Sequence, residues 1–236
     1  MIGERIIDIV FPVRCPLCGE VRPFGDAGVC IECEKELSYV KEPTCLKCGK
    51  TIESSLDEYC ADCMRLPKSF EKCFPAFNYE GQIKDSLYEF KYKNQRGYAG
   101  FYCEGIMKRH GKELKTIPFD GIVPVPVHPH KKRIRGYNQA ELIANQLSKA
   151  INVPVYPDYL VRSEDTNPQK ELDDRERMKN LKNAFIISEN VVKLNTVLLV
   201  DDIYTSGATM EACTEALFKA GVSKAYCTSV AIGRGY

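Results

Sequence analysis

VLLVDDIYTSGAT, residues 197–209, decides the fold of this chain. Four consecutive aliphatic residues predict a strand that is buried on both faces. Two carboxylates, Asp201 and Asp202, stand at its carboxyl end, followed by small hydroxyl-bearing residues around one glycine and then by a helix-like run. Converging backbone N–H groups, hydroxyls and a helix N-terminus favour a bound anion such as phosphate.

This stretch predicts a sugar-phosphate site. The expected phosphate-binding residues are Thr205, Ser206, Gly207, Ala208 and Thr209. The two carboxylates would repel a phosphate, so we expect them to hold sugar hydroxyls directly or through a divalent cation. A pentose with a 5-phosphate and two free hydroxyls meets both demands. The alternative is a buried strand and a capped helix without a ligand; a P-loop is excluded because no Gly-Lys-Ser/Thr follows.

Outward from this stretch, short apolar runs alternate with helix-like segments. Strands are expected near 76–79, 121–127, 196–200 and 225–232, and helices near 82–93, 97–110, 138–150 and 209–220. This alternation predicts an α/β domain over 67–236, with a mostly parallel sheet covered by helices on both faces. Ligands of such sheets bind beyond the carboxyl ends of the strands.

Two further polar segments belong to this domain. The first, VPVPVHPHKKRIRGYNQAE (123–141), predicts a strand end followed by a basic loop. The basic residues of this loop are Lys131, Lys132, Arg133 and Arg135. The loop is either solvated or placed beside the phosphate-binding turn. Residues 160–185 are polar and long enough for a mobile lid. The lid residues that could reach an anionic substrate, unless they belong to a solvated helix, are Arg162, Gln169, Arg177 and Asn180.

Residues 1–66 are expected to form a separate cysteine-rich module. They contain four CxxC pairs, each beginning 15 residues after the previous one, and the first and third pairs end in glycine. Four thiolates hold one zinc ion and leave no open position, so we expect two structural sites. We assign Cys15, Cys18, Cys30 and Cys33 to one zinc, and Cys45, Cys48, Cys60 and Cys63 to the other. A cross-braced pairing, a redox dithiol module and an unmetallated loop remain alternatives.

The composition indicates the cellular compartment in which the protein is expected. The chain has 236 residues, 12 cysteines and a net charge of +1. The first residues are too short and too charged for a signal peptide, and no run is long enough to insert into a membrane, so a cytoplasmic location is expected. Clustered CxxC pairs in that reducing compartment indicate metal rather than disulfides. The isolated Cys73, Cys103, Cys213 and Cys227 are expected to be ordinary small apolar residues.

These motifs resemble a known family. From about residue 8 to the C-terminus, the sequence resembles the ComF family of competence-associated proteins. The stretches that carry the resemblance are CPLCG…CIEC…CLKCG…CADC, RIRGYNQAELIA (133–144), TNPQ…R…N…AF (166–185) and VLLVDDIYTSGAT. The resemblance implies a double zinc ribbon joined to a type I phosphoribosyltransferase domain that binds phosphoribosyl diphosphate with Mg²⁺. It also implies a role in natural transformation, in which single-stranded DNA is taken up.

The resemblance also implies roles for individual residues. Asp201 and Asp202 would be the catalytic residues that position the ribose, and 205–209 would bind its 5-phosphate. The residues expected to hold the diphosphate are Lys131, Arg133, Arg135 and Arg177. The acceptor base and the oligomeric state are not predicted.

Three functions remain open from the sequence. The first is transfer of a phosphoribosyl group to an unidentified acceptor. The second is a non-catalytic protein that senses a sugar phosphate, or binds single-stranded DNA on its basic C-terminal part through Tyr88, Tyr92, Tyr98, Tyr102 and Tyr137. The third is an adaptor whose zinc module docks a competence helicase or a membrane channel protein. That module carries 8 Lys/Arg against 12 Asp/Glu, a balance of −4, which suits protein contact better than contact with DNA phosphates.

Overall fold

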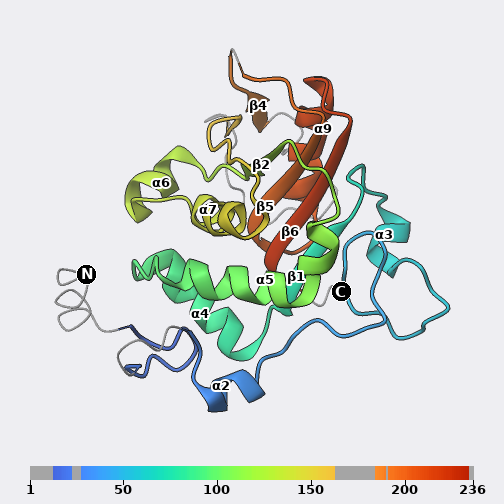
Figure 1. The fold of residues 1–236 in the computed structure, drawn as a ribbon. Coiled ribbons are helices and arrows are strands. Elements are labelled where there is room, and N and C mark those ends of the chain that lie inside the picture. Colours follow the sequence, from blue (N-terminus) through green and yellow to red (C-terminus); the bar gives the residue numbers. More distant parts are fainter. Residues whose placement is uncertain (1–12, 23–27, 163–183, 190, 234–236) are drawn as a thin grey trace.

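A computed structural model of the chain describes residues 13–22, 28–162, 184–189 and 191–233 (Figure 1). Its centre is a four-stranded parallel sheet in the order β1-β6-β5-β2. The strands are β1 (Cys73–Asn78), β2 (Gly121–Pro124), β5 (Thr196–Tyr204) and β6 (Lys224–Ile232). The predicted parallel sheet is therefore confirmed, and each of its strands overlaps an apolar run in the sequence.

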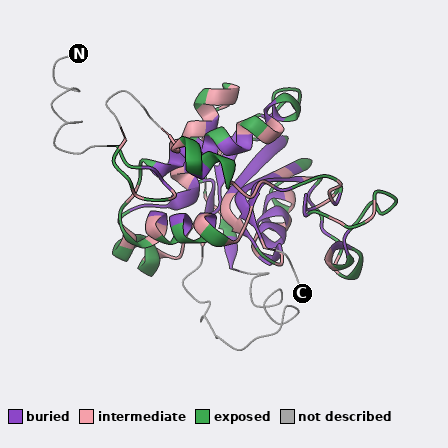
Figure 2. Cartoon of the chain, turned by 90° about the horizontal axis from the view of Figure 1, so that it is seen from below, coloured by how far each residue is buried: buried purple, intermediate pink, exposed green. Residues whose placement is uncertain are grey.

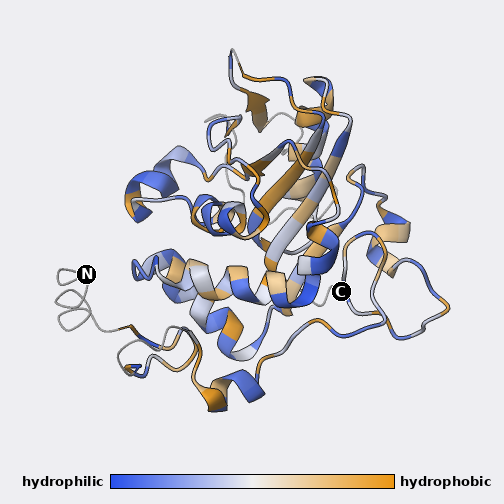
Figure 3. Cartoon of the chain, in the orientation of Figure 1, coloured by the Kyte–Doolittle hydropathy of each residue, from blue (hydrophilic) through white to orange (hydrophobic). Residues whose placement is uncertain are grey.

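Helices cover both faces of the sheet. The longer ones are α4 (Gly81–Tyr92), α5 (Tyr98–Leu114), α7 (Gln139–Ile151) and α9 (Ala208–Lys219). Because successive side chains of β5 point to opposite faces, Val197 and Leu199 join one core and Leu198 and Val200 the other. The first core contains α9, and the second contains α4, α5 and α7. Figure 2 shows the strands buried between these layers, and Figure 3 shows β5 as a largely hydrophobic element.

Several short elements complete the fold. The helices α2 (Ile31–Lys35) and α3 (Ala61–Arg65) belong to the cysteine-rich segment, and α6 (Pro129–Arg135) follows β2. The strands β3 (Leu160–Arg162) and β4 (Phe185–Ile187) form an antiparallel pair on either side of the segment 163–183. This pair was not predicted. Among the described helices, none is both long and apolar enough to cross a membrane.

The basic stretch after β2 corrects a prediction. It was expected to be a loop, but residues 129–135 form a helix. Pro129 occupies the first turn, the His128 side chain accepts a hydrogen bond from the N–H of His130, and Gly136 ends the helix with a φ of 77°. The proline and the glycine that flank the basic residues are the start and stop signals of a short helix.

Candidate functional site

The cysteines form two sets of four. In each set all the sulfur atoms lie within 4.8 Å of one another, and the sets are Cys15, Cys18, Cys30 and Cys33, and Cys45, Cys48, Cys60 and Cys63. The sequential pairing is confirmed, and the cross-braced alternative is wrong. Sγ–Sγ distances are 3.8 Å for Cys18–Cys30 and 3.6 Å for Cys48–Cys60. A tetrahedral Zn–S bond of 2.3 Å requires about 3.8 Å between sulfurs, so both sets fit zinc.

The local structure of the two sets explains this geometry. Cys30 and Cys60 are the N-caps of α2 and α3, so the second pair of each set lies at the start of a helix. The knuckle glycines that end the first pairs, Gly19 and Gly49, both adopt a φ of 75°, a conformation that glycine reaches without steric cost. The four isolated cysteines are all buried outside both sets, as expected.

The turn after β5 joins the strand tightly to a helix N-terminus. β5 ends at Tyr204, and α9 begins at Ala208, only a three-residue turn later. Gly207 has a φ of 74°, and a Cβ atom there would lie 2.1 Å from the hydroxyl of Tyr204. Glycine is therefore required at this position, because the turn needs a left-handed residue and the Tyr204 side chain fills the space beside it. Ser206 and Thr209 are half-buried and Thr205 is exposed, so their hydroxyls lie at or near the surface.

The two carboxylates lie within β5 rather than after it. The N–H of Asp202 donates a hydrogen bond to Asp201 Oδ1 at 2.8 Å. Removal from solvent and the neighbouring Asp202 raise the pKa of Asp201 to about 7, although the charges of Lys91 and Arg162 oppose the rise. Carboxylate oxygens are the ligands that Mg²⁺ prefers, so the side chains of Asp201 and Asp202 are suitable ligands for this ion.

Lys91 was missed by the sequence reading. Its Nζ lies 2.9 Å from Asp202 Oδ2, and the two side chains are 18% and 13% exposed. It comes from the last turn of α4, far from β5 in the sequence. The apolar spacing of Ile83, Leu87 and Phe90 marks the buried face of α4. However, several lysines lie in and around that helix, and the spacing could not show which of them reaches the carboxylates.

The cations of α6 are not equivalent. Lys131, Lys132 and Arg133 are exposed. Arg135 instead donates hydrogen bonds to the Tyr92 hydroxyl at 3.1 Å and to Gln139 Oε1 at 3.0 Å. Its guanidinium also stacks on the Tyr92 ring, 4.9 Å from the centroid. Arg135 thus joins α6 to α4, whereas the other three face solvent; their roles toward a diphosphate stay predictions.

Arg162 lies at the end of β3, beside a cavity of about 330 Å³ that Lys132 and Arg133 also line. Its guanidinium stands over the Phe185 ring at 5.5 Å, and removal from solvent lowers its pKa. Among the described residues its buried Nε has no hydrogen-bond partner. The other lid candidates, Gln169, Arg177 and Asn180, lie outside the described residues.

The five tyrosines proposed as stacking platforms divide into two groups. Tyr98, Tyr102 and Tyr137 are buried and pack in the core. Tyr88 and Tyr92 are 58% and 57% exposed, and their ring centroids lie 4.9 Å apart on α4.

Comparison with known proteins agrees with this arrangement. The double zinc ribbon domain family matches residues 6–64, and the phosphoribosyl transferase domain family matches residues 137–234. Competence protein F of Haemophilus influenzae is 29% identical over 91% of this chain and 94% of its own length. DNA utilization protein YhgH of Escherichia coli is 25% identical over 91% and 95%, and competence protein ComFC of Bacillus subtilis is 24% identical over 83% and 80%. The double zinc ribbon and the phosphoribosyltransferase domain agree with the resemblance to the ComF family, and the chain is similar to competence protein F and competence protein ComFC over most of its length.

Proposed function

We propose that this protein binds phosphoribosyl diphosphate with Mg²⁺ at the carboxyl end of β5 and transfers the phosphoribosyl group to an acceptor. The observation that carries the proposal is the unit formed by β5, the Gly207 turn and α9. It brings two carboxylates, a tight glycine turn and a helix N-terminus together within nine consecutive residues, 201–209. A sugar that carries a phosphate and free hydroxyls matches both parts.

Each part of the site has a task in this reaction. The turn and first residues of α9, 205–209, hold the 5-phosphate through backbone N–H groups and hydroxyls. Asp201 and Asp202 orient the ribose hydroxyls. Lys131, Arg133 and Arg135 of α6, with Arg177, stabilise the diphosphate.

The chemistry is a substitution at C1 of the ribose. The bond from C1 to the diphosphate oxygen breaks, the diphosphate leaves with the electron pair, and an acceptor nucleophile forms the new bond to C1. When bound, Mg²⁺ supplies neutralising charge for the diphosphate. Positive charge builds on the sugar ring as the diphosphate leaves, and the neighbouring carboxylates stabilise it.

The relatives suggest where such a reaction would be used. Their names refer to competence and to DNA utilization. We extend this to the present protein as a cytoplasmic role in the handling of DNA that has been taken up.

Titration calorimetry with phosphoribosyl diphosphate and Mg²⁺ tests the binding proposal on zinc-loaded protein. We expect saturable binding to the wild type and its loss in the double variant Asp201→Asn/Asp202→Asn. Asp85→Asn on the exposed side of α4 is the matched control and should bind normally. Release of diphosphate on addition of an acceptor base would then establish transfer. A folded wild type that binds nothing would overturn the proposal.

A second candidate function is binding of single-stranded DNA at the junction of α4 and α6. The exposed Tyr88–Tyr92 pair lies beside Arg135, and Lys131 to Arg133 are exposed on the same short helix. Exposed aromatic rings next to cations stack bases and neutralise phosphates.

Fluorescence anisotropy with a labelled oligonucleotide tests this candidate. Tyr88→Ala/Tyr92→Ala should weaken binding by roughly tenfold or more, because stacking contributes about 1–3 kcal/mol per base. Binding should also fall steeply as salt is raised. Tyr59→Ala, on an exposed tyrosine of the zinc-binding segment, is the control. Equal affinity of all three proteins would exclude the α4–α6 surface.

A further inference from the structure

The ion pair between Lys91 and Asp202 joins two elements that only the fold brings together. Lys91 lies near the end of α4, outside the part of the chain that matches the phosphoribosyl transferase domain family, residues 137–234. Its partner is the second carboxylate of the sugar site. At 2.9 Å, with both side chains less than one-fifth exposed, the pair is a close and largely enclosed contact.

The last turn of α4 is fixed on both sides of Lys91. Phe90 is buried, and its carbonyl accepts a hydrogen bond from the Tyr137 hydroxyl. Tyr92 receives the hydrogen bond and the stacked guanidinium of Arg135. Lys91 therefore reaches Asp202 from a helix end that is anchored independently of the ion pair.

The neighbouring Lys93 shows what an ordinary lysine of this region does. Its side chain is 58% exposed and pairs with Glu89, four residues earlier, on the surface. Such a pair contributes little free energy. Lys91 is the lysine that this turn directs at the carboxylates, so the two residues form a matched comparison.

The position of Lys91 creates a competition. An ammonium group at Asp202 Oδ2 uses the oxygen that a sugar hydroxyl or a divalent cation would need, and it repels a second cation nearby. An anionic diphosphate has the opposite effect, because it attracts the ammonium group and thereby frees the carboxylate. The arrangement thus opposes a cation that arrives alone and favours one that arrives with an anion.

We propose that Lys91 is an exchangeable counter-ion: it holds Asp202 until substrate binds, then turns to the diphosphate, so that the divalent cation enters with the substrate and not before it. This inference rests on the proposed binding of phosphoribosyl diphosphate. It makes Lys91 a residue that determines both the order and the affinity of binding.

Two titrations on zinc-loaded protein test the proposal. The first uses Mn²⁺ alone, followed by the electron paramagnetic resonance signal of the free ion, with Asp201→Asn/Asp202→Asn as background. The second uses phosphoribosyl diphosphate with Mg²⁺. In Lys91→Met we expect Mn²⁺ to bind at least about fivefold more tightly and the substrate at least about fivefold more weakly, since site-to-site coupling is typically 5–150-fold. Lys91→Arg and Lys93→Met should resemble the wild type.

Opposite changes in the two affinities separate this role from a structural one, because a damaged site would lose both ligands. If thermal unfolding shows that Lys91→Met is poorly folded, Lys91→Gln is used for the same two titrations. Unchanged or weaker Mn²⁺ binding in these variants, with normal substrate binding in the wild type, would overturn the role of Lys91 alone. A wild type that fails to bind phosphoribosyl diphosphate would overturn the proposed function and this inference with it.

Discussion

The two zinc-binding units have the same plan in different surroundings. The first unit, residues 15–33, and the second unit, residues 45–63, share CxxC spacing, a knuckle glycine and a cysteine-capped helix. In the first unit Cys18 is exposed, whereas every cysteine of the second unit is buried. A Cβ on Gly19 would meet nothing within 4 Å, but one on Gly49 would lie 2.4 Å from Pro75 of β1. The repeated sequence pattern therefore specifies the metal ligands, whereas the packing around each unit determines how far that unit stabilises the central sheet.

The second unit is part of the central core. Its cysteines belong to the same apolar cluster as α9 and one face of β5. The N–H of Cys73, the first residue of β1, donates to the carbonyl of Lys47 at 2.7 Å. Lys47 Nζ donates to the carbonyl of Phe70, also at 2.7 Å. Loss of zinc here would disturb the sheet as well as the unit.

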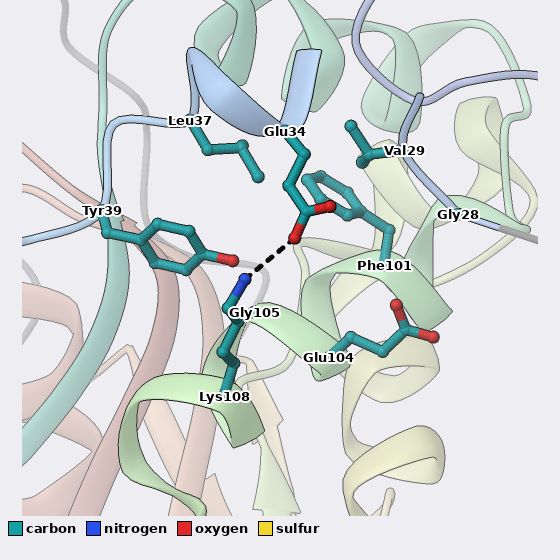
Figure 4. A pocket seen from close by; sticks show the side chains of 9 residues that line it. All are labelled: Gly28, Val29, Glu34, Leu37, Tyr39, Phe101, Glu104, Gly105 and Lys108. Atoms are coloured by element: carbon teal, nitrogen blue, oxygen red, sulfur yellow. Dashed lines mark hydrogen bonds and ion pairs between the residues drawn. The ribbon is translucent and has the colours of Figure 1, made fainter. Parts of the chain in front are cut away.

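The first unit and the residues directly after it meet α5 through a partly open contact, in which Leu17 and Val29 are only partly buried. Lys108 Nζ lies 2.9 Å from Glu34 Oε1 and 5.4 Å from the Tyr39 ring centroid, and the Lys108 and Glu34 side chains are 60% and 54% exposed. Figure 4 shows these side chains around a cavity of about 190 Å³. The exposed ion pair contributes little to stability, and partly buried side chains contribute less than the buried second unit.

The largest expected effect is loss of the second zinc. Cys48→Ser should remove one zinc per chain and lower the melting temperature by about 10 °C or more, because the free energy of metal binding is part of the free energy of folding. Metal analysis and thermal unfolding measure both quantities.

Cys18→Ser in the first unit is the matched variant. It should also remove one zinc, but shift the main unfolding transition by only about 1–3 °C, as expected for a perturbation of 1 kcal/mol or less. Equal shifts in the two variants would show that the units support the sheet equally, and the comparison would fail.

An intermediate effect is expected where the segment after the second unit meets α9. Glu211, 5% exposed, accepts hydrogen bonds from the N–H of Ser69 at 2.8 Å and from its hydroxyl at 2.5 Å. Ser69→Ala should lower the free energy of unfolding by about 1–2 kcal/mol, since this hydroxyl binds a charged acceptor. Chemical denaturation measures the change. Ser54→Ala, whose hydroxyl accepts from an exposed turn N–H, should cost less than about 0.5 kcal/mol.

The smallest effect is expected at the first unit's contact with α5. Lys108→Met should change the free energy of unfolding by less than about 0.5 kcal/mol, because both partners of this ion pair are exposed. Lys50 provides the counterpart in the second unit, since it lies 2.5 Å from Asp62 with 11% of its side chain exposed. Lys50→Met should cost about 1–2 kcal/mol, less than a fully buried pair would. A larger loss in Lys108→Met than in Lys50→Met would reverse the contrast between the units.

The features predicted best from the sequence are those that a few neighbouring residues specify. The apolar run of β5 and the four CxxC pairs each specify their element through neighbouring residues, and both were correctly predicted. The helix at 129–135 was missed because it is short and buries no residue, so no apolar periodicity marks it in the sequence. The burial of the second unit and the contact of Lys91 with Asp202 depend on tertiary packing, which no local pattern reveals.

The pairing of β1 with β6 has a consequence for how the protein is made. β1 pairs in parallel with β6 from Cys73–Cys227 to Asn78–Ile232, and β6 comes after the other described strands in the sequence. During synthesis the zinc-binding cysteines and β1 leave the ribosome before β6, the strand that completes their side of the sheet. Since chains begin to fold from the N-terminus as they are synthesised, we expect the nascent protein to load its metal early and to close its sheet only after β6 has left the ribosome.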